Sequence, residues 1–285
     1  MGDARLIDGK AVAAGVQAEV AERVAALARR GGVPGLAIVL VGSHPASEIY
    51  VRKKLELCAK VGITARLHRF DSEVDEPTLI GAVAALNADA AIHGILVQLP
   101  LPTHLSTKSL IERIDPEKDV DGLHPLNVGR LLTGRPGFIP CTPLGVIRLL
   151  RAYDVDLPGK HAVVLGRSAI VGRPMSWLLL RSHATVTTCH RHTPDSAALA
   201  RTADVLVSAV GRPGLVDASW VKPGAVVIDV GINRLADGRI VGDVDLASVR
   251  ARASMVTPVP GGVGPMTVAM LLHNVTLGAE RALGR

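Results

Sequence analysis

The stretch from residue 160 to residue 180 constrains the fold of this 285-residue chain more than any other segment. It begins with an apolar strand, HAVVLG, passes through the glycine turn GRSAIVG at residues 166–172, and continues into a helix in which Pro174 suits the first turn. A buried strand that opens into a helix through glycines is typical of a Rossmann-type parallel sheet. We therefore expect such a sheet in the second half of the chain.

Helical and strand patterns alternate through the rest of the chain as well. In the first half, strands are expected at 35–41, 64–70 and 93–99, with helices at 10–30, 48–60 and 78–87. In the second half, a helix at 144–153 precedes the glycine turn, and further strands are expected at 184–190, 205–210, 225–230 and 254–257. This order predicts an α/β protein with mostly parallel strands.

The length and the order of elements predict two domains. A break at Pro140 to Pro143 and a turn at Leu157 to Gly159 separate the two series of strands, so the domain change is placed in this stretch. We assign residues 1–143 to an N-terminal α/β substrate domain and residues 144–266 to the Rossmann-type domain. The last helix, within 267–285, is expected to pack back on the first domain.

The composition excludes several classes of protein. Hydrophobic residues make up 48% of the chain and aromatic residues only 2%, so we expect an aliphatic core. The charged start, MGDARLIDGK, does not resemble a signal peptide, and no apolar run approaches the roughly 18 residues of a membrane span. Three widely spaced cysteines indicate neither a disulfide framework nor a structural zinc site. We expect a cytoplasmic protein with no membrane partner.

A formal net charge of +6 suggests an anionic ligand or partner. The Lys and Arg residues are scattered, and the aromatic side chains that would stack on bases are scarce. We therefore expect binding of small anions, such as the phosphates of a dinucleotide, and no nucleic acid.

The glycine turn differs from the common G-x-G-x-x-G pattern. Ser168 stands in place of the second glycine, and one extra residue precedes Gly172. A plain strand-to-helix connection would explain such a turn taken alone. Its position before a helix N-terminus points backbone N–H groups at an anion, which favours a phosphate site.

The end of the next strand indicates which dinucleotide is preferred. NAD enzymes normally have an acidic residue there, whereas this chain reads His190-Arg191-His192 and has no acid before Asp195. This favours NADP, with Arg167 and Arg191 as candidate partners of its 2′-phosphate. Two solvated surface arginines are the alternative.

The expected helix at 48–60 carries Tyr50, Lys54 and Cys58, and Ser47 directly precedes it. Steps of three and four residues place these side chains on one face, so Tyr50 and Lys54 can address the same ligand. Alternatively, Lys54 belongs with Arg52 and Lys53 to a solvated basic face. A lysine can work near neutral pH only if burial or nearby cations destabilise its ammonium.

Polar residues lie within and after the expected strand at 93–99. Gln98 interrupts an apolar strand end and needs a partner there. In the segment DPEKDVDGLHPLNVGRL, from Asp115 to Leu131, the residues Glu117, Asp119, Asp121 and Gly122 match the beginning of a calcium loop. The match fails, because Val128 stands where the bidentate glutamate should be and Pro125 lies within the loop. We expect no metal.

The glycine- and proline-rich segment TPVPGGVGPMT, at 257–267, precedes an apolar helical run. Its backbone is open to a flat ligand because few bulky side chains cover it. We expect this segment to form a wall of a binding site, although a tight turn would explain the segment taken alone.

Five segments together resemble the bifunctional methylenetetrahydrofolate dehydrogenase/cyclohydrolase family. They are SEIYVRKK, GILVQLPLP, DPEKDVDGLHPLNVGRL, VVLGRSAIVGRP and TPVPGGVGPMT, in this order from Ser47 to Thr267. The resemblance implies NADP as cofactor, a folate as substrate and a homodimer. It also implies two reactions, hydride transfer from the methylene bridge to NADP and addition of water to the resulting methenyl cation.

The resemblance also implies roles for single residues. The family's Tyr-x-x-x-Lys pattern matches Tyr50 and Lys54, so Lys54 is the implied catalytic residue and Tyr50 stacks on or orients the substrate. Gln98 positions the lysine, and Asp121, the last Asp of D-V-D-G, binds the pterin ring. Further substrate contacts are expected at Pro260, Gly261 and Gly264. Cofactor contacts are expected at Gly166, Arg167, Ser168, Ile170, Gly172, Arg191, Ile232 and Thr142.

Two other functions are kept as alternatives. One is a different NADP-dependent oxidoreductase of a small substrate, such as a hydroxy-acid dehydrogenase; the other is a non-catalytic binder of folate or nucleotide. The combination of Tyr50, Lys54, Gln98 and Asp121 favours the bifunctional enzyme over both. A folate ligase is not expected, because the chain has no G-x-x-x-x-G-K-[ST] loop for ATP.

Overall fold

The computed structural model describes residues 3–284, apart from the side chain of Ala46; the predicted domain ranges also include residues 1, 2 and 285, which lie outside it. The chain forms two compact units. The small-sheet unit consists of Gly15–Cys141 with Met270–Arg285, and the large-sheet unit of Met1–Ala14 with Thr142–Ala269. Helices α1 (Gly9–Ala28) and α10 (Val263–Ala282) contribute residues to both units. The predicted division at residues 143/144 stays a prediction.

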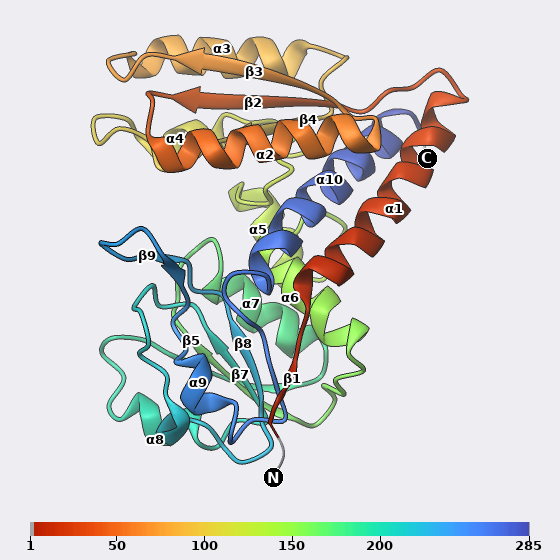
Figure 1. The fold of residues 1–285 in the computed structure, drawn as a ribbon. Helices are drawn as coiled ribbons and strands as arrows, with labels where there is room; N and C mark the ends of the chain where they lie inside the picture. The colour runs from red at the N-terminus through yellow and green to blue at the C-terminus, as the bar shows by residue number, and fades with distance from the viewer. Residues whose placement is uncertain (1–2, 285) are drawn as a thin grey trace. The chain divides into compact units, whose positions relative to one another are not determined.

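The small-sheet unit is built on a parallel sheet with the strand order β3-β2-β4. The strands are β2 (Gly35–Val41), β3 (Thr64–Phe70) and β4 (Gly94–Val97). Every residue of the central strand β2 is buried, as expected for an apolar strand with both faces covered. Helices α2 (Pro45–Val61) and α3 (Glu76–Ala88) lie on opposite sides of the sheet (Figure 1).

Side-chain alternation along β2 explains this layering. Ala37, Val39 and Val41 form a core cluster with Leu79 and Val83 of α3, so the other residues of the strand face the opposite side. Helix α3 begins at a cap in which Asp75 accepts a hydrogen bond from the Thr78 backbone N–H over 2.8 Å. Helices α4 (Thr107–Glu112) and α5 (Pro125–Leu132) follow the sheet.

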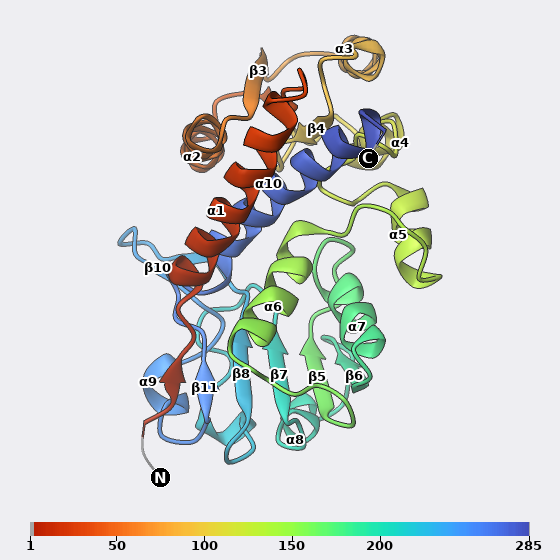
Figure 2. The same ribbon diagram turned by 90° about the vertical axis from the view of Figure 1, so that its right-hand side faces the viewer.

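The large-sheet unit contains a six-stranded parallel sheet with the order β1-β11-β8-β7-β5-β6. The strands are β1 (Arg5–Leu6), β5 (His161–Leu165), β6 (Thr185–Cys189), β7 (Val205–Ser208), β8 (Val226–Asp229) and β11 (Met255–Val256). Figure 2 shows the strands from β11 to β6 side by side in this order. The expected Rossmann-type sheet is therefore confirmed.

Helices connect the strands of this sheet. They are α6 (Cys141–Ala152), α7 (Gly172–Arg181), α8 (Ser196–Ala200), the 3-10 helix η1 (Ala218–Trp220) and α9 (Leu246–Val249). A short antiparallel hairpin pairs β9 (Asn233–Arg234) with β10 (Ile240–Val241). Helix α6 begins three residues earlier than expected, because Pro143 falls in its first turn, where no intrahelical N–H is required.

The end of α10 packs within the small-sheet unit, which confirms the expected packing of the last helix. Arg23 of α1 binds Glu280 through two hydrogen bonds, with Nε–Oε1 and Nη2–Oε2 distances of 2.8 and 2.7 Å. Gly278 of α10 lies directly against His93, since a Cβ at residue 278 would be 2.5 Å from the His93 carbonyl oxygen. Small side chains on α10 thus allow the helix to approach the sheet.

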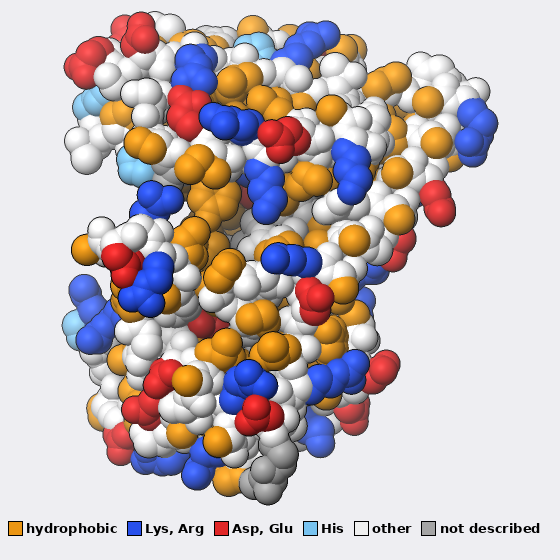
Figure 3. All heavy atoms as spheres, in the orientation of Figure 1, with side chains coloured by type: hydrophobic (Ala, Val, Ile, Leu, Met, Phe, Trp, Pro, Cys, Tyr) orange, Lys and Arg blue, Asp and Glu red, His pale blue; other side chains and the backbone are white. Residues whose placement is uncertain are grey.

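The surface carries charges of both signs. Basic and acidic side chains are interspersed on the face shown in Figure 3. Between residues 3 and 284, no helix combines the length and the apolar character needed to cross a membrane.

Candidate functional site

The amino group of Lys54 contacts Gln98 in the small-sheet unit. Helix α2 presents Lys54 half-buried, and its Nζ donates a hydrogen bond to Gln98 Oε1 over 2.8 Å. Gln98 follows the last residue of β4, and its amide Nε2 donates to the Leu99 carbonyl over 2.7 Å. Because that second bond orients the amide, the oxygen of Gln98 is held toward the lysine. The expected partner of this glutamine is thus Lys54.

Burial lowers the pKa of Lys54 from its ordinary value. The negative charge of the Asp121 carboxylate opposes this effect without reversing it. Arg52 and Lys53, considered above as a source of nearby positive charge, are both exposed. The environment therefore makes the neutral amine easier to form at Lys54 than at a free lysine, and it leaves Lys53 in solvent.

Asp121 completes a charged cluster with Lys54. The backbone at Asp119 forms a parallel bridge with Ile95, and the Ile95 N–H donates to the Lys118 carbonyl over 2.8 Å, so this loop extends the sheet beside β4. The Cys141 thiol lies beside the Asp121 carboxylate and donates to the Val120 carbonyl, with 3.4 Å between Sγ and the carbonyl oxygen. Burial raises the pKa of Asp121, and the Lys54 ammonium opposes that rise.

The two aspartates of the D-V-D-G segment have different partners. Asp119 accepts hydrogen bonds from the backbone N–H groups of Leu123 and His124 over 3.2 and 2.8 Å, and from Asn127 Nδ2 over 2.9 Å. Its carboxylate is buried, and burial raises its pKa to about 6. Asp119 thus holds the turn, while the Asp121 carboxylate accepts no backbone N–H among the described residues.

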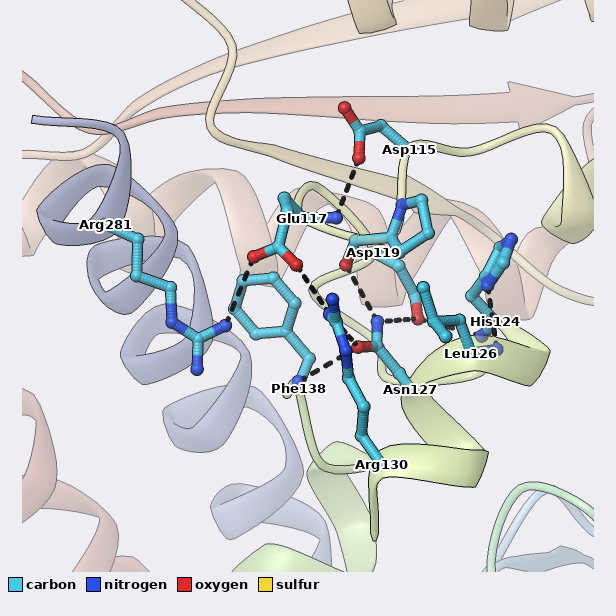
Figure 4. A network of polar contacts seen from close by, with 10 residues as sticks. Asp115, Glu117, Asp119, His124, Leu126, Asn127, Arg130, Phe138 and Arg281 are labelled. Carbon is cyan, nitrogen blue, oxygen red and sulfur yellow. Dashed lines mark hydrogen bonds and ion pairs between the residues drawn. The ribbon is translucent and has the colours of Figure 1, made fainter. Parts of the chain in front are cut away.

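Asn127 anchors the same loop from helix α5. Besides contacting Asp119, its Nδ2 donates to the Pro116 carbonyl over 2.8 Å, and its Oδ1 accepts from the Phe138 N–H and from Arg130 (Figure 4). Arg130 in turn pairs with Glu117 over 2.5 Å. These contacts make the loop before Asp121 rigid and leave Asp121 itself outside the network.

Tyr50 and Ser47 lie on the same stripe of α2 as Lys54. Ser47 and Cys58 are buried, whereas 38% of Tyr50 is exposed. An exposed aromatic ring one helical turn from Lys54 is suited to stacking on a flat ligand.

In the large-sheet unit, the glycine turn lies between β5 and α7. Gly166 has a φ of +111°, and a Cβ there would lie 2.2 Å from the Ala209 carbonyl oxygen. The Ser168 hydroxyl accepts hydrogen bonds from the N–H groups of Val171 and Gly172 over 3.2 and 3.3 Å. Ser168 therefore shapes the turn, while Arg167 and Ile170 are exposed beside it.

The carboxyl end of β6 carries the expected basic residues. Arg191 is exposed, and its Nε donates to His192 Nε2 over 3.0 Å. The acidic residue nearest in sequence, Asp195, caps α8 by accepting from the Ala198 N–H over 2.9 Å. No carboxylate of this strand end is thus available for ribose hydroxyls, and the cationic surface suits a phosphate group.

The remaining candidate residues also lie in the large-sheet unit. Thr142 shares a hydrogen bond with Thr267, with 2.9 Å between their hydroxyl oxygens. Pro260 is exposed, Gly261 has a φ of +111°, and Ile232 is 50% exposed. A Cβ on Gly264 would lie 3.8 Å from Ile232 Cδ1, so these two residues are neighbours. Pro265 falls in the first turn of α10, as expected.

Comparison with known proteins shows which family this chain belongs to. Residues 7–121 match the catalytic domain of the tetrahydrofolate dehydrogenase/cyclohydrolase family model, and residues 140–283 match its NAD(P)-binding domain. The chain belongs to this family. The bifunctional protein FolD of Bordetella petrii is 56% identical over 281 residues, which cover 99% of this chain and 96% of that protein. The FolD protein of Geobacillus thermodenitrificans is 54% identical over 280 residues, 98% of each chain.

A solved structure supports the same family assignment. The crystal structure of the Trypanosoma brucei methylenetetrahydrofolate dehydrogenase-cyclohydrolase, complexed with NADP cofactor and inhibitor, has a TM-score of 0.96. It is 44% identical and covers 100% of both chains. The resemblance drawn from five segments is therefore confirmed. The roles of the single residues in this family member stay predictions.

Some polar residues near the site were not singled out from the sequence. Cys141 was considered only as a free thiol, yet it lies beside Asp121 and donates to the Val120 carbonyl over 3.4 Å. Asn274 of α10 is buried and donates to the carbonyls of Val120 and Ile139 over 2.8 and 3.0 Å. A polar residue inside the apolar pattern of a helix was the available signal, because it needs a buried partner.

Proposed function

We propose that this protein is a bifunctional enzyme of one-carbon folate metabolism. It oxidises 5,10-methylenetetrahydrofolate to 5,10-methenyltetrahydrofolate with NADP and hydrolyses the product to 10-formyltetrahydrofolate. The observation that carries this proposal is the half-buried Lys54 amine, bonded to Gln98 beside the Asp121 carboxylate. Together with family membership, this cluster favours the bifunctional enzyme over another NADP-dependent oxidoreductase of a small substrate.

The dehydrogenase step depends mainly on positioning. NADP supplies the hydride acceptor when bound. The N–H groups at the start of α7 bind its phosphates, and Arg167 and Arg191 bind the 2′-phosphate. Gly166, Ser168, Ile170, Gly172, Thr142 and Ile232 complete the cofactor contacts in this proposal. Little acid-base chemistry is needed, since correct placement of the bridge carbon lowers most of the barrier.

The cyclohydrolase step depends on proton transfer. The neutral Lys54 amine takes a proton from the water that attacks the methenyl carbon, and Gln98 holds the amine in place. The bond between this carbon and one of its two nitrogens then breaks, which opens the ring. The step gives the formyl derivative and releases one proton overall. A lysine with a lowered pKa suits this task, because lowering the pKa increases the neutral fraction of the amine at any given pH.

Substrate recognition is assigned to five residues in this proposal. Asp121 accepts two parallel hydrogen bonds from the amino-pyrimidinone ring of the pterin. Tyr50 stacks on the substrate, and Pro260, Gly261 and Gly264 form a wall beside it. Among the residues that the structure describes, no backbone N–H binds the Asp121 carboxylate, which supports the first assignment.

Further proposals concern the cellular compartment, the oligomeric state and the cofactor preference of the enzyme. We place it in the cytoplasm, as a homodimer with a preference for NADP over NAD. The lack of a carboxylate for the ribose at the end of β6 supports the cofactor preference.

One experiment tests the proposed function as a whole. Purified protein receives methylenetetrahydrofolate and NADP, and the absorbance of the methenyl product is followed over time. We expect the absorbance to rise as the first reaction proceeds and then to decay faster than it does without enzyme. A protein that produces no methenyl compound contradicts the proposal.

A further inference from the structure

Two buried aspartates lie in the large-sheet unit and take no part in either reaction. Asp229 is the last residue of β8 and Asp243 follows β10; their exposed fractions are 2% and 0%. Burying two carboxylates this close together is costly unless hydrogen bonds compensate both. Their partners therefore show what these residues do.

The carboxylate of Asp243 collects donors from two separate loops. Its Oδ2 accepts from the N–H groups of Val210 and Gly211 and from the Ser208 hydroxyl, over 2.7, 3.2 and 3.3 Å. Its Oδ1 accepts from the Arg212 N–H and from Asn233 Nδ2, both over 2.9 Å. One side chain thus joins the loop after β7 to the segment after β8.

Asp229 holds Asp243 in place. Its Oδ1 accepts from the backbone N–H groups of Gly231 and Asp243, each over 2.9 Å, and its Oδ2 accepts from the Val244 N–H over 2.9 Å. The approach requires a glycine at residue 242, where a Cβ would lie 1.7 Å from Asp229 Oδ2. The backbone around Asp243 is therefore set by the end of β8.

Both loops lie next to the predicted cofactor residues. The loop after β7 lies beside the glycine turn. The Ala209 N–H donates to the Leu165 carbonyl over 2.8 Å, and a Cβ on Gly166 would clash with the Ala209 carbonyl oxygen. The segment after β8 contains Ile232, directly between Gly231 and Asn233. Carboxyl ends of parallel strands form the ligand-binding edge of such a sheet.

We propose that Asp243 is the positioning residue of the NADP site. Its carboxylate holds residues 208–212 and 231–233 in the shape that the cofactor requires, without touching the cofactor. The proposal rests on the proposed function, because it assumes that NADP binds at this edge of the sheet. It assigns to Asp243 an effect on cofactor affinity and none on water addition.

The two activities of one chain provide the test. Asp243→Asn keeps the size of the side chain but turns one acceptor into an NH₂ group that opposes its donors. We expect the KM for NADP to rise about tenfold or more, while the rate of hydrolysis of methenyltetrahydrofolate, measured without NADP, stays within about twofold. Asp237→Asn is the matched control, because Asp237 is exposed in the nearby hairpin and its carboxylate binds Arg239. This variant should leave both the KM for NADP and the rate of hydrolysis unchanged.

A second variant keeps the test decisive if Asp243→Asn does not fold. Asn233→Ala removes a single donor to Asp243 and should raise the KM for NADP about threefold, again with unchanged hydrolysis. The proposal is overturned if both variants keep the KM for NADP of the unmodified protein, or if hydrolysis falls in parallel with NADP use, as expected from general loss of structure. Failure of the unmodified protein to use NADP at all would contradict the proposed function instead.

Discussion

Gln98 accepts a hydrogen bond from the Lys54 ammonium over 2.8 Å, which connects the end of β4 to the middle of α2. An amide oxygen orients the amine without adding a negative charge beside it. This distinction matters, because a neutral acceptor leaves the pKa of Lys54 lowered by burial, whereas a carboxylate would favour the charged form.

Gln98→Glu tests this relationship. The carboxylate keeps the contact but raises the pKa of Lys54, so the neutral amine becomes scarce near pH 7. We expect cyclohydrolase activity at pH 7 to fall about tenfold or more and to recover partly at higher pH, since one pKa unit changes the neutral fraction about tenfold. Gln98→Met, which removes the acceptor, should lower activity without moving the pH profile upward. Identical profiles for Gln98→Glu and the unmodified protein would argue against Lys54 as the base.

The pH dependence of the unmodified enzyme follows from the direction of the Lys54 shift. Lowering the pKa means that the amine loses its proton at a lower pH than a free lysine does. Cyclohydrolase activity should therefore increase as pH rises through this lowered pKa and level off above it. Initial rates of methenyl decay, corrected for the reaction without enzyme at each pH, measure this. An activity that falls over the same range would show that the ammonium is the active form.

Asp121→Ala separates substrate recognition from folding. We expect folate binding to weaken greatly while the affinity for NADP and the melting temperature stay nearly unchanged, because few protein donors depend on this carboxylate. Asp119→Ala is the contrasting variant, since it leaves buried N–H groups without an acceptor and should cost roughly 1–3 kcal/mol of stability. Thermal unfolding without ligand and folate titration measure the two effects. A large drop in melting temperature for Asp121→Ala would make it a structural residue.

Arg191→Ala tests cofactor preference. The unmodified enzyme should use NADP more efficiently than NAD, and the variant should lose much of that difference, because a charge-assisted bond to a phosphate contributes roughly 1.5–3 kcal/mol. The catalytic efficiencies with both cofactors measure this. Arg181→Ala, which removes another exposed arginine at the end of α7, should change neither value. Equal efficiencies with NADP and NAD in the unmodified enzyme would reject the preference.

The sequence predicted the elements that carry long apolar patterns. Strands β2 and β3 have the expected bounds: β2 is an uninterrupted apolar run, and β3, which is more polar, lies between Gly62 and Asp71. Strand β1 was not predicted: it contains only Arg5 and Leu6 and exists because it pairs with β11, far along the chain. The hairpin of β9 and β10 is similarly too short to show a period.

The site shows the same limit. Helical spacing placed Tyr50 and Lys54 on one face, and the rule that a buried polar group needs a partner pointed to Gln98. Spacing could not distinguish Asp119 from Asp121, since their difference lies in which backbone N–H groups each carboxylate meets. Asp243 was missed because its partners come from two loops that only the folded sheet brings together.

The hydrolysis of methenyltetrahydrofolate by Lys54→Met tests the central claim most directly. Methionine keeps the apolar stem but removes the amine, so the fold and NADP binding should survive. We expect the enzymatic decay of methenyl absorbance to fall by about 100-fold to 10,000-fold, with a smaller loss of hydride transfer. Lys53→Met, which changes the exposed neighbour, should retain both activities. If Lys54→Met hydrolyses the methenyl substrate normally and Lys53→Met does not, the catalytic face of α2 has been assigned wrongly.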